Sequence, residues 1–273
     1  MTAAKFPPGT ATSSPKTSLP TMYDLPSEDP EEPGLPDEYH LWQAQLCSLT
    51  FRPPAYPSEQ VFVASDLNLY YDVEHPRWYK RPDWYAVVGG SRLYEGSDLR
   101  LSYVIWQEQV TPIVAMEFLS PSTEAEDLGQ RQWQGPQPSK WEVYEQILAI
   151  PYYVVFSRYT DKLQVFRLEA GRYREQRLTE SRIWLSELEL GLGLWQGEYC
   201  GVTRQWLRWF DRENRWIATD AERERQQKET AQLQRDRERQ QKEQALKAQL
   251  AAEQRAAKLA ERLKQLGIDP DEI

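Results

Sequence analysis

The 273-residue sequence contains only two cysteines, Cys47 and Cys200, and only two histidines, His40 and His75. Two cysteines so far apart in sequence form neither a disulfide framework nor a zinc-binding motif. Without a cluster of histidine and cysteine residues, zinc hydrolysis and a Ser-His-Asp triad are poorly supported. These shortages argue against the hydrolase classes that depend on histidine or cysteine.

Long apolar segments are also missing. No run of apolar residues approaches the roughly 18 residues that a transmembrane helix needs. The N-terminal residues lack the apolar central region of a signal peptide. We therefore expect a soluble, cytoplasmic protein with no membrane partner.

Aromatic residues are absent from the last part of the chain, because all 33 Phe, Trp and Tyr residues lie at or before Trp216. From Asp220 onward the sequence has 12 basic and 12 acidic residues, so the whole net charge of −9 falls on the aromatic-rich part. An acidic body weakens the case for tight, nonspecific binding of duplex DNA. An acidic active site would itself supply part of this charge.

Composition predicts three segments. Residues 1–33 are rich in Pro, Ser, Thr and acidic residues and are expected to be a disordered leader. Residues 34–200 are expected to be the folded domain. Residues 201–273 are expected to be a helical or coiled-coil extension, with a helical pattern from about Thr203.

The extension contains a short repeat. The segment RERQQKE at 223–229 recurs at 237–243, an offset of two heptads. An apolar seam with coiled-coil spacing follows, formed by Ala252, Ala256, Leu259, Leu263 and Leu266. Two interpretations remain open: a single solvated helix stabilised by Glu–Arg and Glu–Lys pairs, or a partial coiled coil that forms a homodimer.

The folded domain mixes helices and strands. Pro36-Asp37-Glu38 predicts the start of a first helix, which stops before Pro53-Pro54. Ser139 is a predicted N-cap, with Glu142 completing a capping box, for a second helix from 140 to about 149. Strand-like runs are predicted at 61–63, 67–71, 84–88, 101–106, 113–119 and 151–156, with a hairpin at 162–168 and 172–178. The order predicts an α+β or mixed α/β fold.

Two acids adjoin predicted strands. Asp83 precedes the run 84–88, and Glu117 lies 34 positions later within the run 113–119. If these strands are neighbours in one sheet, the two carboxylates can converge and bind Mg²⁺ (or Mn²⁺). By spacing alone, two such acids are more simply surface residues. Their apolar flanks favour the site, because a charge in such a context needs a partner or an ion.

A nearby lysine would suit hydrolysis of a phosphodiester, because it can orient water or offset developing negative charge. Lys140 is the candidate, since its helix can return to the sheet end after Glu117; otherwise it is a solvated first-turn lysine. Tyr144 lies at i+4 on the same helix face. Glu38 is a candidate third carboxylate or, more simply, a helix-start charge. Asp127 is a candidate orienting residue or an ordinary turn residue.

These residues together resemble a known family. The segments that carry the resemblance are Arg81-Pro82-Asp83, Glu117 to Thr123, Lys140 with Tyr144, and Pro151 to Val155. They are similar to the Uma-two family of bacterial endonucleases, which has the restriction-endonuclease-like PD-(D/E)XK fold. The resemblance covers about residues 37–194, so the leader and the C-terminal helix lie outside it.

The resemblance implies a central mixed sheet flanked by helices, with Asp83 and Glu117 as metal ligands and Glu38 as an auxiliary acid. The superfamily pattern has a lysine two residues after the second acid, where this chain has Leu119. In this family a lysine on the following helix is thought to replace it, and Lys140 fits that role. The implied partner is DNA, as substrate.

Three functional hypotheses follow. The first is a metal-dependent endonuclease acting on DNA through two carboxylates and a lysine. The second is a catalytically silent nuclease fold that acts as a scaffold through its C-terminal helix. The third is a structural core-plus-coiled-coil protein. The many Trp and Tyr residues also permit an aromatic surface that stacks on single-stranded nucleic acid, although most are expected to pack in the core.

Overall fold

The computed structural model describes residues 37–120, 123–130 and 135–265. The predicted leader at 1–33 and the seam residue Leu266 lie outside the described residues. The chain divides into two compact units between Ile217 and Ala218. The first unit is a mixed α+β body, which confirms the predicted fold class, and the second contains one long helix.

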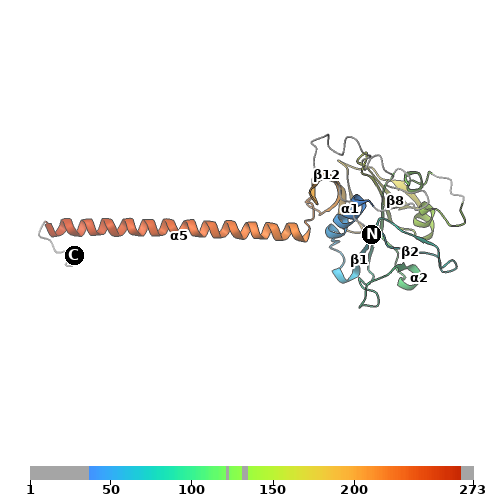
Figure 1. The fold of residues 1–273 in the computed structure, drawn as a ribbon, viewed down its shortest axis with the longest axis horizontal. Helices are drawn as coiled ribbons and strands as arrows, with labels where there is room; N and C mark the ends of the chain where they lie inside the picture. The colour runs from blue at the N-terminus through green and yellow to red at the C-terminus, as the bar shows by residue number, and fades with distance from the viewer. Residues whose placement is uncertain (1–36, 121–122, 131–134, 266–273) are drawn as a thin grey trace, which may run out of the picture. The chain divides into compact units, whose positions relative to one another are not determined.

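A six-stranded mixed sheet organises the body (Figure 1). Its strand order is β1-β4-β6-β7-β8-β9, and only the β6–β7 pair is parallel. The bounds are β1 (Val61–Ala64), β4 (Trp84–Val88), β6 (Val114–Phe118), β7 (Tyr152–Ser157), β8 (Lys162–Glu169) and β9 (Arg172–Glu175). The strands next to Asp83 and Glu117, β4 and β6, are therefore neighbours, as the site hypothesis required.

Two smaller sheets flank the main one. One has the order β10-β11-β12 and the other the order β3-β2-β5. Their bounds are β10 (Arg182–Leu185), β11 (Leu190–Tyr199), β12 (Val202–Phe210), β2 (Leu69–Tyr70), β3 (Tyr79–Lys80) and β5 (Tyr103–Val104). The strand predicted at 101–106 is confirmed only for β5, because the chain then turns into the short helix α2 (Ile105–Glu108).

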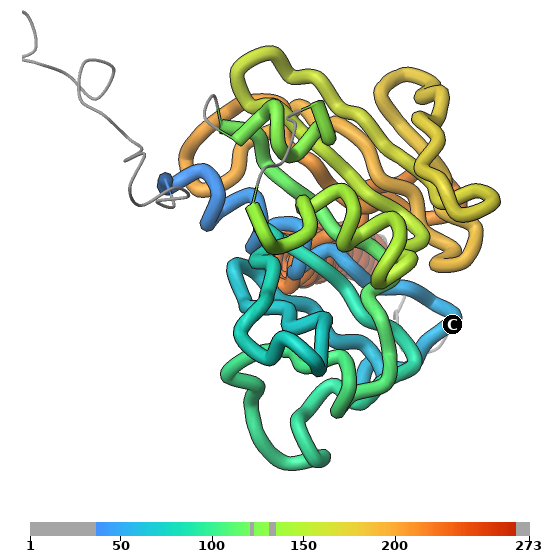
Figure 2. The backbone as a smooth tube through the Cα atoms, turned by 90° about the vertical axis from the view of Figure 1, so that its right-hand side faces the viewer, coloured from blue at the N-terminus to red at the C-terminus, as the bar shows by residue number. Residues whose placement is uncertain are grey.

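Side chains alternate between the two faces of the main sheet and form two apolar clusters. On one face Met116 and Val154 pack with helix α1 (Glu38–Thr50) and with strands β11 and β12. Gln43 of α1 bonds both backbone groups of Leu207 in β12, so these distant segments lie side by side (Figure 2). On the other face Ala115 and Tyr153 pack with residues of the second helical segment.

The second helical segment is an α-helical turn, α4 (Lys140–Glu142), followed by a π-helical segment, η3 (Val143–Ile147). The predicted N-cap is confirmed, because the Ser139 hydroxyl accepts a hydrogen bond from the Glu142 N–H at 3.1 Å. The wider turn appears as a bond from the Leu148 N–H to the Val143 carbonyl. Such π-turns are rare and are frequent at functional sites. A short helix α3 (Glu124–Asp127) precedes it, and a short 3₁₀ turn, η2 (Ser58–Gln60), precedes β1.

The helical pattern predicted from about Thr203 is wrong at its start, because residues 202–210 form strand β12. The predicted extension at 201–273 thus includes a strand of the body. The reason is a tight hairpin: Tyr199 pairs with Val202, and Cys200 and Gly201 between them both have positive φ, +51° and +77°. Two such residues make the turn type that suits the twist of antiparallel strands.

The second unit contains α5 (Asp220–Gln265), a single helix of 46 residues (Figure 1). A capping box begins it: the Glu222 N–H donates to the Thr219 hydroxyl at 3.2 Å, and the Thr219 N–H donates to the Glu222 carboxylate at 2.7 Å. Pairs such as Lys247–Glu243 at 3.2 Å add a few tenths of a kcal/mol each. Within the described residues, no helix is both long enough and apolar enough to cross a membrane.

Candidate active site

Glu117 is a buried acid in the middle of the main sheet. It lies in β6 between the neighbours β4 and β7, and only 1 % of its side chain is exposed. Strand alternation places it on the same face as Ala115, toward η3. A carboxylate in this position is costly unless other groups contact it.

Lys140 supplies the main contact. Its Nζ lies 3.1 Å from Oε2 of Glu117 and 2.8 Å from Oδ1 of Asp127, whose side chain is 2 % exposed. The ammonium group therefore bridges two buried carboxylates from β6 and α3. The structure brings together Glu117, Lys140 and Asp127, three of the residues singled out from the sequence, and places Asp127 in direct contact with the ammonium group.

Two tyrosines complete the packing around these acids. The Tyr144 hydroxyl donates to Oε1 of Glu117 at 3.0 Å, so both oxygens of this carboxylate accept hydrogen bonds. The Tyr153 hydroxyl donates to the backbone carbonyl of Asp127 at 2.8 Å. Both tyrosines are fully buried, which fixes the orientation of the groups they contact.

Asp83 immediately precedes β4 and is half-buried. Its Oδ2 accepts a hydrogen bond from the Phe118 N–H at 2.5 Å, which ties it to the residue after Glu117. Nε2 of His40 lies 3.9 Å from the same oxygen and donates to the Phe118 carbonyl at 2.8 Å. The Asp83 carboxylate is thus hydrogen-bonded to the backbone of Phe118, the residue that directly follows Glu117.

Burial dominates the electrostatics of the group. It raises the pKa of the Glu117 carboxyl well above its usual range; the Lys140 charge opposes this, and Asp127 and Asp83 add to it. Burial also raises the pKa of Asp83, against the charges of His40 and Lys140. For Lys140 burial alone would lower the pKa, but Glu117, Asp127 and Asp83 outweigh it and raise the pKa. Lys140 is therefore a persistent cation among acids.

Glu38, the predicted auxiliary acid, is not brought into this group. Its carboxylate is on the exposed side of α1 and accepts a hydrogen bond from the Trp42 indole at 3.2 Å. The preceding residue, Asp37, reaches the group instead, through Nδ1 of His40 at 2.6 Å. A catalytic role for Glu38 stays a prediction without a contact to support it.

Sequence reasoning missed His40 and Lys80. His40 follows Asp37 by three residues in the first turn of α1, a spacing that lets the two side chains meet and that could have drawn attention to the pair. Lys80 in β3 is buried, and its pKa is lowered by burial and by the Lys140 charge, while Glu126 and Glu117 oppose the shift. Nothing in the local sequence distinguishes it from a surface lysine.

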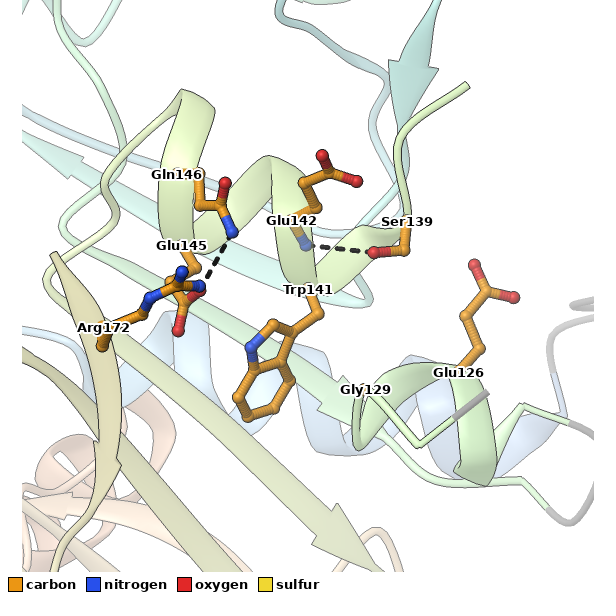
Figure 3. Close-up of a pocket in the computed structure, with 8 residues that line it drawn as sticks. All are labelled: Glu126, Gly129, Ser139, Trp141, Glu142, Glu145, Gln146 and Arg172. Carbon is orange, nitrogen blue, oxygen red and sulfur yellow. Dashed lines mark hydrogen bonds and ion pairs between the residues drawn. The ribbon is translucent and has the colours of Figure 1, made fainter. Parts of the chain in front are cut away.

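A surface cavity of about 290 Å³ is lined by residues that neighbour Asp127 and Lys140 in the sequence (Figure 3). Glu145 in its wall is paired with Arg172 at 2.9 Å. Gly129 has φ +66°, and a Cβ there would lie 2.8 Å from the Trp141 ring, so this wall requires glycine. The lining residues are Glu126, Gly129, Ser139, Trp141, Glu142, Glu145, Gln146 and Arg172. The cavity adjoins Asp127 and Lys140 in sequence, but its rim is acidic and its main ion pair is structural.

The donor set can be tested against a divalent cation. Within residues 37–120, 123–130 and 135–265, no set of three or more His, Cys, Asp or Glu side chains is arranged to hold a metal ion. Mg²⁺, however, is commonly held by one or two carboxylates and keeps several waters. Formally, three carboxylates (Asp83, Glu117 and Asp127) and one ammonium (Lys140) leave two negative charges, and the hard oxygens of Asp83 and Glu117 suit such an ion.

The chain matches the model of a known protein family. The model of the Uma2 family, described as "Putative restriction endonuclease", matches residues 20–205, which include Asp83, Glu117 and Lys140. No curated protein matches the chain. The matched range contains the whole six-stranded sheet and ends within β12.

Proposed function

This chain belongs to the Uma2 family of restriction-endonuclease-like proteins, and we propose that it is a metal-dependent endonuclease that hydrolyses phosphodiester bonds in DNA. The observation that carries the proposal is the contact of Lys140 with the buried carboxylate of Glu117 at 3.1 Å, in the strand next to β4, which Asp83 immediately precedes. A buried acid with a strongly perturbed pKa and a specific charge partner is typical of catalytic sites.

Asp83 and Glu117 would hold Mg²⁺ or Mn²⁺. Their strands are hydrogen-bonded neighbours, and the Phe118 N–H ties the Asp83 carboxylate to β6. When bound, the ion would polarise a nonbridging phosphate oxygen and lower the pKa of the attacking water. Tyr144 holds one oxygen of Glu117 and so limits the rotation of its carboxylate.

Lys140 would donate hydrogen bonds to the attacking water or to the phosphate. Its pKa is raised, so the ammonium stays charged and can donate hydrogen bonds but cannot act as a base. We propose that it offsets the negative charge that develops on the phosphate and orients the attacking water. Asp127, at 2.8 Å, positions the ammonium group rather than contacting substrate.

Metal binding is the first test. Titrating the intact protein with Mn²⁺ in a calorimeter is expected to show binding that is lost in Asp83→Ala and Glu117→Ala, because each substitution removes a proposed ligand. The control Asp98→Ala removes an exposed acid in a turn and is expected to bind as the wild type does. If the intact protein binds no Mn²⁺ or Mg²⁺, the endonuclease proposal is wrong.

A second candidate is a catalytically silent scaffold that acts through α5. The body carries the whole net charge of −9, which disfavours DNA, and α5 exposes Leu246, Leu250 and Leu259. Metal binding without cleavage of plasmid, single-stranded or branched DNA would favour this scaffold. Both candidates allow α5 to pair with a second copy of the chain.

For the predicted homodimer through α5, light scattering of the full chain is expected to give twice the 32.1 kDa chain mass. The double substitution Leu259→Glu and Leu263→Glu places charges on the proposed seam and is expected to give the monomer mass. Leu233→Glu, outside the seam, is the matched control and is expected to stay dimeric. If the chain without residues 218–273 still contains two chains per particle by light scattering, α5 does not drive association.

A further inference from the structure

The last residue of β6 lacks an ordinary strand partner on one side. Trp84 lies opposite Met116 in the β4–β6 register, so Pro82 would lie opposite Phe118. Proline has no N–H and cannot donate to the Phe118 carbonyl. The Pro82 carbonyl is also engaged elsewhere, because it accepts the Asp66 N–H at 3.2 Å. The two backbone groups of Phe118 therefore need other partners.

Two side chains replace the missing strand. Oδ2 of Asp83 accepts the Phe118 N–H at 2.5 Å, and Nε2 of His40 donates to the Phe118 carbonyl at 2.8 Å. The same ring nitrogen lies 3.9 Å from Oδ2 of Asp83. One imidazole therefore contacts both the end of the Glu117 strand and the carboxylate of Asp83.

His40 is held firmly from its other side. Its Nδ1 lies 2.6 Å from Oδ1 of Asp37, and Oδ2 of Asp37 accepts a hydrogen bond from Arg158 at 2.5 Å. Asp37 also N-caps α1 through the His40 N–H. A carboxylate and a carbonyl are both acceptors, so both ring nitrogens donate and the ring carries a positive charge. The ring is thus fixed between Asp37 and the end of β6, and Arg158, which follows β7, holds Asp37 in turn.

We propose that His40 is a positioning residue for the metal-binding pair. It holds the Asp83 carboxylate and the end of β6 in one arrangement, so that Asp83 and Glu117 keep the separation that a divalent cation requires. Groups that orient metal ligands from behind commonly change affinity by about 10-fold to 100-fold. This inference rests on the proposed function.

The test compares His40→Ala, His40→Gln and Asp37→Asn with the wild type. The matched control is His75→Gln, because His75 has the same relation to an acid: its Nδ1 lies 2.7 Å from Asp72, three residues before it, on the surface. Mn²⁺ affinity is measured by calorimetry, and exchange of the Phe118 amide hydrogen by NMR. His40→Ala is expected to bind Mn²⁺ about 10-fold or more weakly and to speed exchange at Phe118.

The conservative variant separates positioning from packing. His40→Gln keeps one donor for the Phe118 carbonyl and is expected to recover part of the affinity, while His75→Gln changes neither readout. If His40→Ala does not fold by circular dichroism, His40→Gln and Asp37→Asn carry the comparison. Unchanged Mn²⁺ affinity in folded variants of a metal-binding wild type would overturn the inference alone. A wild type that binds no metal would overturn it together with the proposed function.

Discussion

Lys140→Met is expected to lower the free energy of unfolding at pH 8 by about 3 to 5 kcal/mol, because it leaves two buried carboxylates without their cation. Glu117 and Asp127 are 1 % and 2 % exposed and both contact the Lys140 ammonium. Urea unfolding followed by circular dichroism measures the loss.

The pH dependence of this loss has a definite sign. The Lys140 charge lowers the pKa of Glu117, so removing it raises that pKa further. When the pKa of a carboxyl is higher in the folded state than in the unfolded state, the folded protein loses stability as the pH rises above the ordinary pKa of that carboxyl, which is near 4.5 for Glu117. The deficit of Lys140→Met is therefore expected to be small near pH 4 and to grow toward pH 8.

A double substitution tests the cause. Lys140→Met combined with Glu117→Gln is expected to recover part of the lost stability. The second substitution removes one of the two buried carboxylates that Lys140→Met leaves without a cation. The control Lys162→Met changes an exposed lysine at the start of β8 and is expected to stay within about 0.5 kcal/mol of the wild type. Equal losses at pH 4 and pH 8 would contradict an electrostatic origin.

Glu117→Gln is expected to reduce DNA cleavage by roughly 1,000-fold or more while leaving the free energy of unfolding unchanged or higher. The amide is nearly isosteric: its oxygen can take the place of Oε2 and accept from the Lys140 ammonium, which lies at 3.1 Å, while its NH2 group donates to the Tyr144 hydroxyl oxygen, which lies at 3.0 Å from the other carboxylate oxygen. Removing a buried carboxylate whose pKa is raised relieves a desolvation cost. Loss of activity without loss of stability is typical of a functional acid.

Plasmid nicking in Mg²⁺ and thermal unfolding provide the two measurements for Glu117→Gln. Glu175→Gln, on the exposed edge strand β9, is the control and is expected to cleave at the wild-type rate. Cleavage by Glu117→Gln at the wild-type rate would assign the activity to another site or to a contaminating nuclease. A large fall in stability with no change in cleavage would make Glu117 a structural residue.

Much of the fold was predictable because its signals are local. The runs at β4, β6 and β7 are short, apolar and bounded by Pro or polar residues, so strand periodicity located them within a residue or two. Strand β12 was mispredicted because the residues after Thr203 also suit a helix. The hairpin at Cys200 and Gly201 decided in favour of the strand, because it pairs residues 202–210 with β11.

The candidate site was predictable only in part. Asp83 and Glu117 stood out because each adjoins an apolar strand, and Lys140 because its helix follows. Lys80 did not stand out, because its neighbours at the site come from other elements, and His40 had only its spacing from Asp37 as a local signal. The π-turn at η3, which places Tyr144 against Glu117, has no local signature in the sequence.

The sequence by itself determined which acids stand beside which strands, and where the aromatic body gives way to a neutral helix. Only the tertiary structure decided which charges are buried and which partner compensates each of them. The physical reason is that desolvation depends on everything packed around a group, including segments distant in the chain. Lys140 thus bridges Glu117 and Asp127. The backbone groups of Phe118, which lie opposite Pro82, are hydrogen-bonded by His40 and Asp83 instead of by a neighbouring strand.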